Sequence, residues 1–321
     1  MAGTPHHGSE SLFAAPLWIE QLRHVNAKAR GLTRLLVATD FSMSADLALA
    51  RALRLPWGEG ATITLLHAAR PVPGRAPLGD ILLEGRCLGR VAGAVRRRLS
   101  LRAPGHVQVK EELRTGEPVE EVSQVARQLE VELVIAGRPY TARGQEPTVR
   151  GSTVRGLVLR LDAPLLVVGA HPARAYQRPM VAVDLSEDSR RALELALRIC
   201  PAPVGVDVLH VPEPFQVPGL WQEGMTAHEH WMAVRQEQET AARKALSRFL
   251  APYREAGRDC EMLIRCGVPL EEALLEEAVE RGTDLLAVGM RATAEGQPRS
   301  ALAERLVMKA SCDVLVARPH T

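Results

Sequence analysis

The stretch that decides the fold is Leu35-Leu36-Val37-Ala38-Thr39-Asp40-Phe41-Ser42, which recurs as Met180-Val181-Ala182-Val183-Asp184-Leu185-Ser186 with its Asp 144 residues later. Each copy is followed by an Ala/Leu-rich pattern typical of a helix. Further matches follow in the same order: 64–67 with 207–210, 116–118 with 267–269, 132–137 with 284–289, and 164–168 with 313–317. Ordered matches of this kind indicate a tandem duplication.

Each half alternates short apolar, β-branched runs with helical stretches, which predicts a parallel sheet covered by helices on both faces. The expected fold class is α/β, with two tandem five-stranded Rossmann-type domains packed as a pseudo-dimer. A fused pair retains the two-fold interface of a symmetric dimer, so the apolar final strands 165–168 and 314–317 are the expected contact. The ten expected strands are 34–39, 61–67, 107–113, 132–136, 164–168, 179–183, 204–210, 259–265, 284–288 and 313–317.

The repeat divides the 321 residues into four segments. Residues 1–30 are an N-terminal extension, in which 11–25 are expected to form a short amphipathic helix. Residues 31–170 form the first domain, 171–178 the linker, and 179–321 the second domain. A linker this short predicts that the two domains touch.

Composition excludes several function classes. A net charge of +2 gives no overall field for nucleic acid or a membrane surface, and 3% aromatic residues disfavour base stacking, so neither partner is expected. Five scattered cysteines without a Cys-x-x-Cys pair predict neither disulfides nor a zinc site. With no apolar signal or membrane-spanning segment in the sequence, we expect a cytoplasmic protein.

Ligands of an open parallel sheet bind beyond the carboxyl ends of its strands. In the first half these ends carry Ala38-Thr39-Asp40, His67-Ala68 and the loop that starts at Gly137. That loop leads to Gly151-Ser152-Thr153 at the expected start of a helix, where free backbone N–H groups, a close-approaching Gly and two hydroxyls suit a phosphate. The same residues also suit a simple helix cap.

Other polar clusters are interpreted as structural. His67 and His210 occupy equivalent strand ends, which favours a shared backbone role over catalysis. His228-Glu229-His230 and Arg96-Arg97-Arg98 are expected on solvated helix faces, because histidines two apart do not share a metal and three charges are few for nucleic acid. Cys260 and Cys266 are expected to be buried thiols.

The Val-Ala-Thr-Asp-Phe-Ser opening, the Leu-Leu-His strand end, the Gly-x-Pro before a helix and the Gly137 loop to Gly151-Ser152 resemble the universal stress protein family. The resemblance extends over residues 32–319, once in each half, and implies adenine nucleotide alpha hydrolase-like domains that in some members bind ATP. Carried over to this chain, it implies a nucleotide site, with Mg²⁺ accompanying the nucleotide, at Ala38, Thr39, Asp40, Ala68, Gly137, Gly151, Ser152 and Thr153.

The glycine loops depart from the family pattern. In the first half Tyr140 stands at the second glycine position, and the loop from Gly137 to Gly151 is one residue longer than the pattern. In the second half Ser300 and Ala301 replace the glycine and the hydroxyl residue, and that loop is three residues shorter than the first. We therefore expect one nucleotide per chain, in the first half.

No catalytic triad, carboxylate pair or metal cluster is evident in the sequence. The favoured interpretation is an adenine-nucleotide-responsive signalling or regulatory protein of the stress response, with an unidentified protein partner and further association into a homodimer. Two alternatives stay open: an interaction scaffold that binds no nucleotide, and a slow ATPase.

Overall fold

The structure is a computed structural model that describes residues 31–70, 77–102, 107–139, 152–169, 174–213, 226–290 and 301–318. The helix expected over residues 11–25 lies outside these ranges. All ten expected strands are present. The first half contains β1 (Leu32–Ala38), α2 (Met43–Ala52), β2 (Trp57–Ala69), α3 (Pro77–Arg102), β3 (Val107–Thr115), α4 (Pro118–Gln128), β4 (Leu133–Gly137), α5 (Ser152–Arg160) and β5 (Leu165–Val168).

The second half repeats this order of strands and helices. Its elements are β6 (Pro179–Val183), α6 (Glu187–Ile199), β7 (Val206–His210), α7 (Ala227–Glu255), β8 (Cys260–Ile264), α8 (Leu270–Glu280), β9 (Leu285–Gly289), α9 (Ala301–Lys309) and β10 (Asp313–Ala317). The repeated Ser has the same local role in both halves. Ser42 caps α2 and Ser186 caps α6, each accepting the N–H three residues ahead at 3.3 Å, which satisfies a backbone donor that a helix start leaves free.

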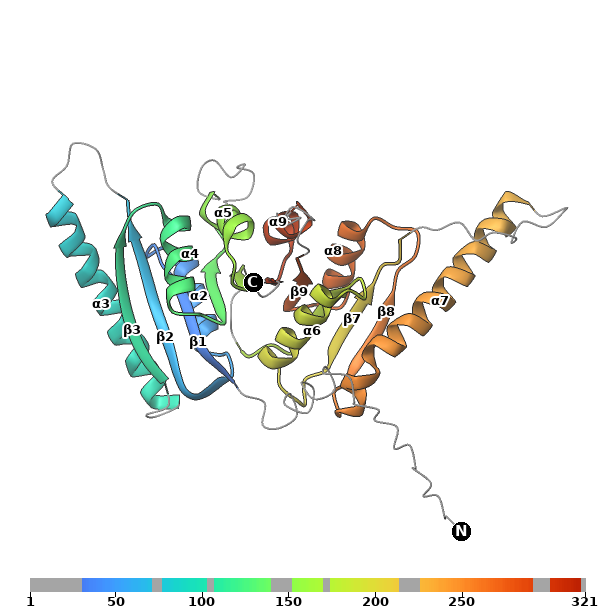
Figure 1. Cartoon of the computed structure of the whole chain (residues 1–321), viewed down its shortest axis with the longest axis horizontal. Helices are drawn as coiled ribbons and strands as arrows, with labels where there is room; N and C mark the ends of the chain where they lie inside the picture. Colours follow the sequence, from blue (N-terminus) through green and yellow to red (C-terminus); the bar gives the residue numbers. More distant parts are fainter. Residues whose placement is uncertain are drawn as a thin grey trace, which may run out of the picture.

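The strands form one ten-stranded sheet in the order β3-β2-β1-β4-β5-β10-β9-β6-β7-β8 (Figure 1). Every neighbouring pair is parallel except β5 with β10, which meet antiparallel at the centre, with Leu166 opposite Leu315. The halves are therefore related by a pseudo-two-fold axis between these strands. The α/β fold, the pseudo-dimer and its contact are confirmed.

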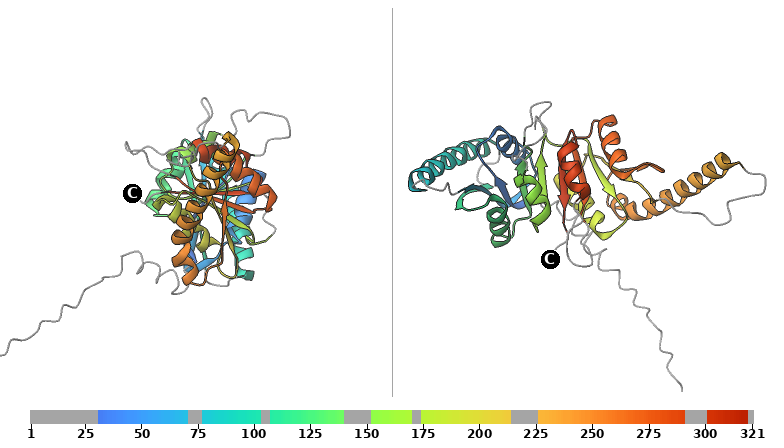
Figure 2. Two further views of the ribbon diagram at one scale, coloured as in Figure 1. Left: turned by 90° about the vertical axis from the view of Figure 1, so that its right-hand side faces the viewer. Right: turned by 90° about the horizontal axis from the view of Figure 1, so that it is seen from above.

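Helices cover both faces of the sheet (Figure 2), and each face has its own apolar core. Buried residues of α2, α3, α6 and α7 form the core of one face, and those of α4, α5, α8 and α9 form the core of the other. α3 and α7 lie at opposite ends of the molecule, against the outer strands (Figure 1). None of the described helices combines the length and the low charge needed to cross a membrane.

A buried ion pair joins the halves. Arg51 of α2 donates from Nε to Asp313 of β10 at 2.8 Å, and the two side chains are 4% and 0% exposed. The Tyr176 hydroxyl and the Gly169 N–H also donate to this carboxylate, at 2.8 and 3.0 Å. The guanidinium stacks on the Tyr176 ring and donates to the carbonyl of Arg174. The connecting segment therefore contributes to the core between the halves.

Two more arginines cross the interface to helix C-termini, where backbone carbonyls lack partners. Arg138, after β4, donates to the carbonyl of Ala310, directly after α9, and to that of Cys312, directly before β10. Arg318, after β10, donates to the carbonyls of Leu157 and Val158 in α5. Positive charge is favourable at these helix ends, so each half stabilises a helix of the other.

Candidate functional site

The predicted site residues that follow β1, β2 and β4 lie where the winding of the sheet reverses. β1 lies between β2 and β4, so the connection from β1 passes to one side of the sheet and the connection from β4 to the other. A crevice forms beyond the carboxyl ends of such strands. Ala38, Asp40 and Gly137 lie at this edge, and the β1–β4 register pairs Val37 with Ile135 just before it.

The turn after β1 leaves one oxygen of Asp40 available. Asp40 is exposed, and its Oδ1 accepts the Ser42 N–H at 3.0 Å, while Oδ2 has no partner among the described residues. Thr39 is buried and its Oγ1 accepts the Phe41 N–H at 3.1 Å. Phe41 adopts a left-handed φ of 62°, uncommon for a side chain of its size, so the chain turns sharply and leaves Asp40 at the rim.

The backbone of Ala68 faces the same edge. β1 ends at Ala38, which pairs with Leu66, and the Thr39 N–H donates to the Leu66 carbonyl at 2.9 Å. In a strand, peptide groups that point to the same neighbour recur every second residue. Ala68 therefore directs its N–H and C=O to the side where β1 has ended, next to the turn that carries Asp40.

The His67 side chain contacts the turn after β1 through Thr39 and Phe41. Its Nδ1 lies 2.7 Å from the Thr39 carbonyl, and since a carbonyl only accepts, Nδ1 carries a hydrogen. The His67 ring packs against Phe41 with centroids 4.4 Å apart, and its Nε2 faces a Glu84 carboxylate oxygen of α3 at 3.5 Å. In the second half His210 Nδ1 lies 2.8 Å from the Val183 carbonyl. Both histidines thus have the backbone role that their positions predict.

His67 faces a carboxylate of α3, but His210 has no equivalent carboxylate in α7, a difference that the sequence analysis did not predict. In α3 the buried residues from Leu88 to Leu99 have the same spacing as those from Ala242 to Tyr253 in α7, and this match places Gln238 at the position of Glu84. Gln238 donates to the Glu213 carbonyl at 2.8 Å instead. The helix register, visible in the sequence, was the available signal.

Gly137 has a packing reason to be glycine. A Cβ at this position would lie 2.1 Å from the Ser44 carbonyl oxygen, because the first turn of α2 crosses directly over the end of β4. Gly289 has the same relation to Asp188 of α6, at 2.5 Å. Both glycines are therefore required by helix–sheet packing, whether or not a ligand binds nearby.

The predicted phosphate-binding helix starts where the sequence places it. α5 begins at Ser152, and the Thr153 side chain in its first turn is half-buried. Gly151 and Tyr140 lie outside the described residues. Arg138, which the sequence places in the same loop, directs its guanidinium to the end of α9, so this charge serves the interface between the halves.

The second half has a different chemistry at the equivalent edge. α9 begins at Ala301, so its first turn contains Leu302 and Glu304 where α5 has Thr153 and Arg155. The two charged side chains, Arg155 and Glu304, pair with each other at 3.7 Å, so the difference between the two helix starts is the loss of both hydroxyl residues in α9. Asp184 Oδ1 accepts both the N–H and the hydroxyl of Ser186, at 3.0 and 2.5 Å.

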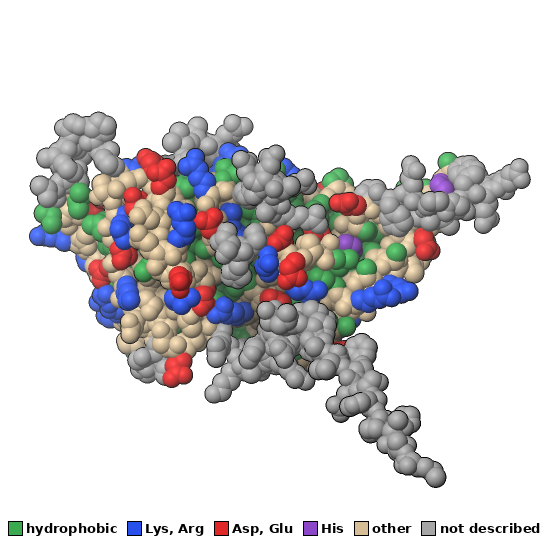
Figure 3. Space-filling model, in the orientation of Figure 1, with side chains coloured by type: hydrophobic (Ala, Val, Ile, Leu, Met, Phe, Trp, Pro, Cys, Tyr) green, Lys and Arg blue, Asp and Glu red, His purple; other side chains and the backbone are tan. Residues whose placement is uncertain are grey.

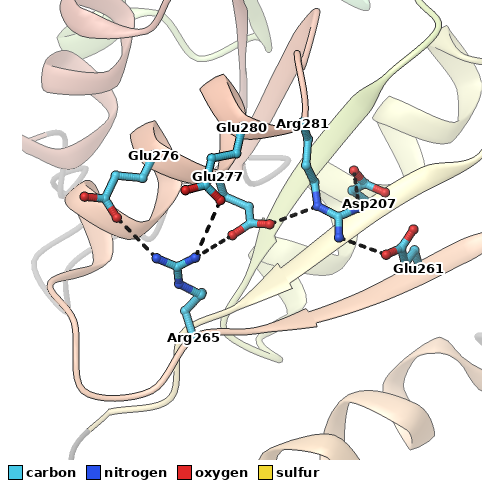
Figure 4. A network of polar contacts seen from close by, with 7 residues as sticks. All are labelled: Asp207, Glu261, Arg265, Glu276, Glu277, Glu280 and Arg281. Carbon is cyan, nitrogen blue, oxygen red and sulfur yellow. Dashed lines mark hydrogen bonds and ion pairs between the residues drawn. The ribbon is translucent and has the colours of Figure 1, made fainter.

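A cavity of about 420 Å³ lies at the opposite edge, at the amino ends of β6 and β7. Its wall includes Arg281, which donates to Asp207, Glu261 and Glu277 at 3.2, 2.9 and 2.9 Å (Figure 4). Glu277 also accepts from Arg265 at 2.9 Å, which extends the network along α8. These contacts hold α8 on the outer strands, and the cavity is remote from the carboxyl edge.

Glu229 has a role in local structure. Glu229 forms a capping box with Thr226 at the start of α7. No metal-binding group of three His, Cys, Asp or Glu side chains occurs within the described parts of the chain. Cys260 and Cys266 are buried, and burial raises the pKa of both thiols.

Comparison with known proteins identifies the repeat. The sequence profile of the universal stress protein family matches twice, at residues 31–169 and 175–318. No curated protein matches the chain.

Solved structures share the fold of the whole chain. A universal stress protein from Archaeoglobus fulgidus is 17% identical, with a TM-score of 0.61 over 88% of this chain and 97% of its own. A functionally unknown protein from Pseudomonas aeruginosa is 15% identical, with a TM-score of 0.53 over 93% of this chain and 95% of its own. At these identities the likeness supports the tandem α/β fold alone.

Proposed function

The chain belongs to the universal stress protein family, and from this premise we propose that it is a nucleotide-responsive regulatory protein whose first half binds ATP. The proposed site lies at the carboxyl edge between β1, β2 and β4, with the phosphates at the start of α5. The proposal extends to a cytoplasmic location and to homodimer formation.

The nucleoside part of the ligand fits the turn after β1. Asp40 is exposed and its Oδ2 has no partner within the described part of the chain, and the Ala68 N–H and C=O point to the same side. A ribose hydroxyl or the adenine amino group donates to a carboxylate, and the N–H and C=O of a peptide group suit the mixed donors and acceptors of an adenine edge.

The phosphates fit the start of α5. We propose that the backbone at Gly151, Ser152 and Thr153 binds them, helped by the two hydroxyls, and that Mg²⁺ enters with the nucleotide, neutralising phosphate charge. One observation carries the assignment to the first half: the first turn of α5 contains the hydroxyl residues Ser152 and Thr153, whereas that of α9 has Ala301 and Leu302 in their place. The charged residues of the two turns, Arg155 and Glu304, pair with each other at 3.7 Å.

The first test compares the two equivalent aspartates by calorimetry with ATP and Mg²⁺. Asp40→Asn retains an oxygen for the Ser42 N–H but loses the charge that faces the ligand, so ATP should bind weaker by about 1–3 kcal/mol. Asp184→Asn is the matched control and should leave the affinity unchanged. A stoichiometry near two, or an equal loss in both variants, would contradict a single site in the first half.

The second test compares the two loops. Gly151→Val should abolish ATP binding by blocking close approach of the backbone to phosphate, and Ser300→Val should leave it intact. Heating the purified protein and separating the supernatant by anion exchange shows whether nucleotide copurifies.

Two alternatives give different results in the same experiments. A scaffold would bind no ATP at millimolar concentration with Mg²⁺, which would implicate Tyr140 in the loop. A slow ATPase would release ADP from labelled ATP, which requires a group that orients water. Retention of intact ATP supports the regulatory function.

A further inference from the structure

Helix α3 has two opposite faces with different chemistry. Leu88, Ala92, Val95 and Leu99 are 5% exposed or less and belong to the core under β2 and β3. Their spacing of three to four residues places them on one side of the helix. The opposite side faces away from the protein at the end of the molecule (Figure 1).

The outward side presents leucines and arginines. Leu82, Leu83 and Leu101 are 65%, 60% and 87% exposed, although leucine is among the residue types most often buried. Arg86, Arg90 and Arg97 lie between them along the helix and are exposed. From Leu83 to Leu101 this face extends about 27 Å, at 1.5 Å per residue.

The charge of this face is uniformly positive. Residues 85–109 contain six arginines and no acidic residue. Among the described residues Arg86 and Arg97 have no ion-pair partner, and Arg90 contacts the Cys87 sulfur at 3.1 Å. By contrast Arg96, at the side of the helix, is paired with Glu111 at 2.7 Å. Side chains of Lys or Arg and apolar residues meet at the α3 end of the molecule (Figure 3).

The fold does not require such a face, as the equivalent helix of the second half shows. α7 also lies between the second and third strands of its half and buries Ala242 and Leu246. Its exposed outward residues include both signs of charge, with Glu237, Lys244, Arg248 and Glu255. The uniform charge of α3 is therefore not shared by its counterpart α7.

We propose that the outward face of α3, defined by Leu82, Leu83, Arg86, Arg90, Arg97 and Leu101, docks an acidic helical segment of a partner protein. Guanidinium groups bind carboxylates through paired hydrogen bonds. Arg86 and Arg90 are one helical turn apart and Arg97 two turns further, so a helix lying alongside offers carboxylates at the same intervals. Apolar side chains at both ends of that helix would cover the leucines.

The order of leucines and arginines along the outward face of α3 favours a protein partner over a lipid surface or DNA. An amphipathic helix that enters a membrane buries a continuous apolar face and keeps its basic residues at the polar side. On α3 the arginines occupy the middle of the face and separate the leucines by several turns. The leucines at both ends of the outward face of α3 contribute nothing to binding a phosphate backbone.

The test uses a synthetic helical peptide of about 20 residues with Glu in register with the three arginines and Leu at both ends. Fluorescence anisotropy at low salt should show binding to the unmodified protein. The triple variant Arg86→Ala, Arg90→Ala, Arg97→Ala should bind at least about tenfold more weakly, since each exposed ion pair contributes about 0.5 kcal/mol. Lys244→Ala with Arg248→Ala, on the outward side of α7, is the matched control and should bind as the unmodified protein does.

Three further comparisons distinguish an acidic helical partner from a lipid surface or DNA. Leu83→Ser with Leu101→Ser should also weaken binding, and a peptide with Gln in place of Glu should not bind. Vesicles of phosphatidylcholine with about 30% phosphatidylserine, and duplex DNA, should bind no better to the unmodified protein than to the triple variant. Circular dichroism checks that the variants fold. Absence of peptide binding, binding that survives the arginine substitutions, or arginine-dependent binding of vesicles or DNA instead of the peptide overturns the proposal.

Discussion

Removing the charge of Asp313 should uncouple the two halves of the sheet. Asp313 is fully buried and accepts from Arg51, Tyr176 and the Gly169 N–H. Asp313→Asn retains the shape but leaves the buried Arg51 guanidinium without a counter-charge. Breaking one side of a buried ion pair costs about 3–5 kcal/mol, so the variant should lose this much unfolding free energy.

A smaller change at the same cluster gives a stability loss with which that of Asp313→Asn can be compared. Tyr176→Phe removes one hydrogen bond, to Asp313, and retains the ring on which Arg51 stacks at 3.9 Å. A net loss of about 1 kcal/mol is expected. Arg51→Met combined with Asp313→Leu removes both charges, and it should be more stable than Asp313→Asn, because no unpaired charge remains in the core.

Urea unfolding followed by circular dichroism measures these differences. Because Arg51 belongs to the first half and Asp313 to the second, Asp313→Asn should also broaden the transition as the halves unfold less cooperatively. The reasoning would be refuted if Asp313→Asn cost no more than Tyr176→Phe, or if the double variant were the least stable of the three.

Two other predictions concern stability. Gly137→Ala should lower the unfolding free energy by about 1–3 kcal/mol, because its Cβ would lie 2.1 Å from the Ser44 carbonyl oxygen. Gly79→Ala, where a Cβ meets no atom within 4 Å, is the control, and equal effects in urea unfolding would contradict the packing argument. Burial raises the pKa of Cys312 from 9.0 to about 12, so its thiol ionises in the unfolded chain first. The protonated thiol's contribution to the unfolding free energy is fully present below about pH 9 and is lost between about pH 9 and 12. In Cys312→Ala the unfolding free energy, measured by urea unfolding, should therefore decrease less steeply across this pH range. Parallel curves for the two proteins would count against this.

The sequence predicted the strands, the helices and the central contact, because these depend on local patterns that repeat. Residues 165–168 and 314–317 are apolar throughout, so the sequence predicts that they meet, and β5 and β10 do. The caps at Ser42 and Ser186 follow from the same repeat. The positions of Asp40 and Ala68 at one edge follow from the rule that parallel strands end together.

Tertiary structure alone decided which distant side chains meet. Arg51 and Asp313 are 262 residues apart, and nothing in either local pattern indicates that one partners the other. Gly137 matches a ligand-binding motif in the sequence, and the tertiary structure adds a separate reason for glycine, the close approach of α2. The physical reason is that secondary structure follows from periodicity along the chain. The partner of a buried charge, and the need for glycine at a crowded position, depend instead on atoms from distant parts of the sequence that the fold brings into contact.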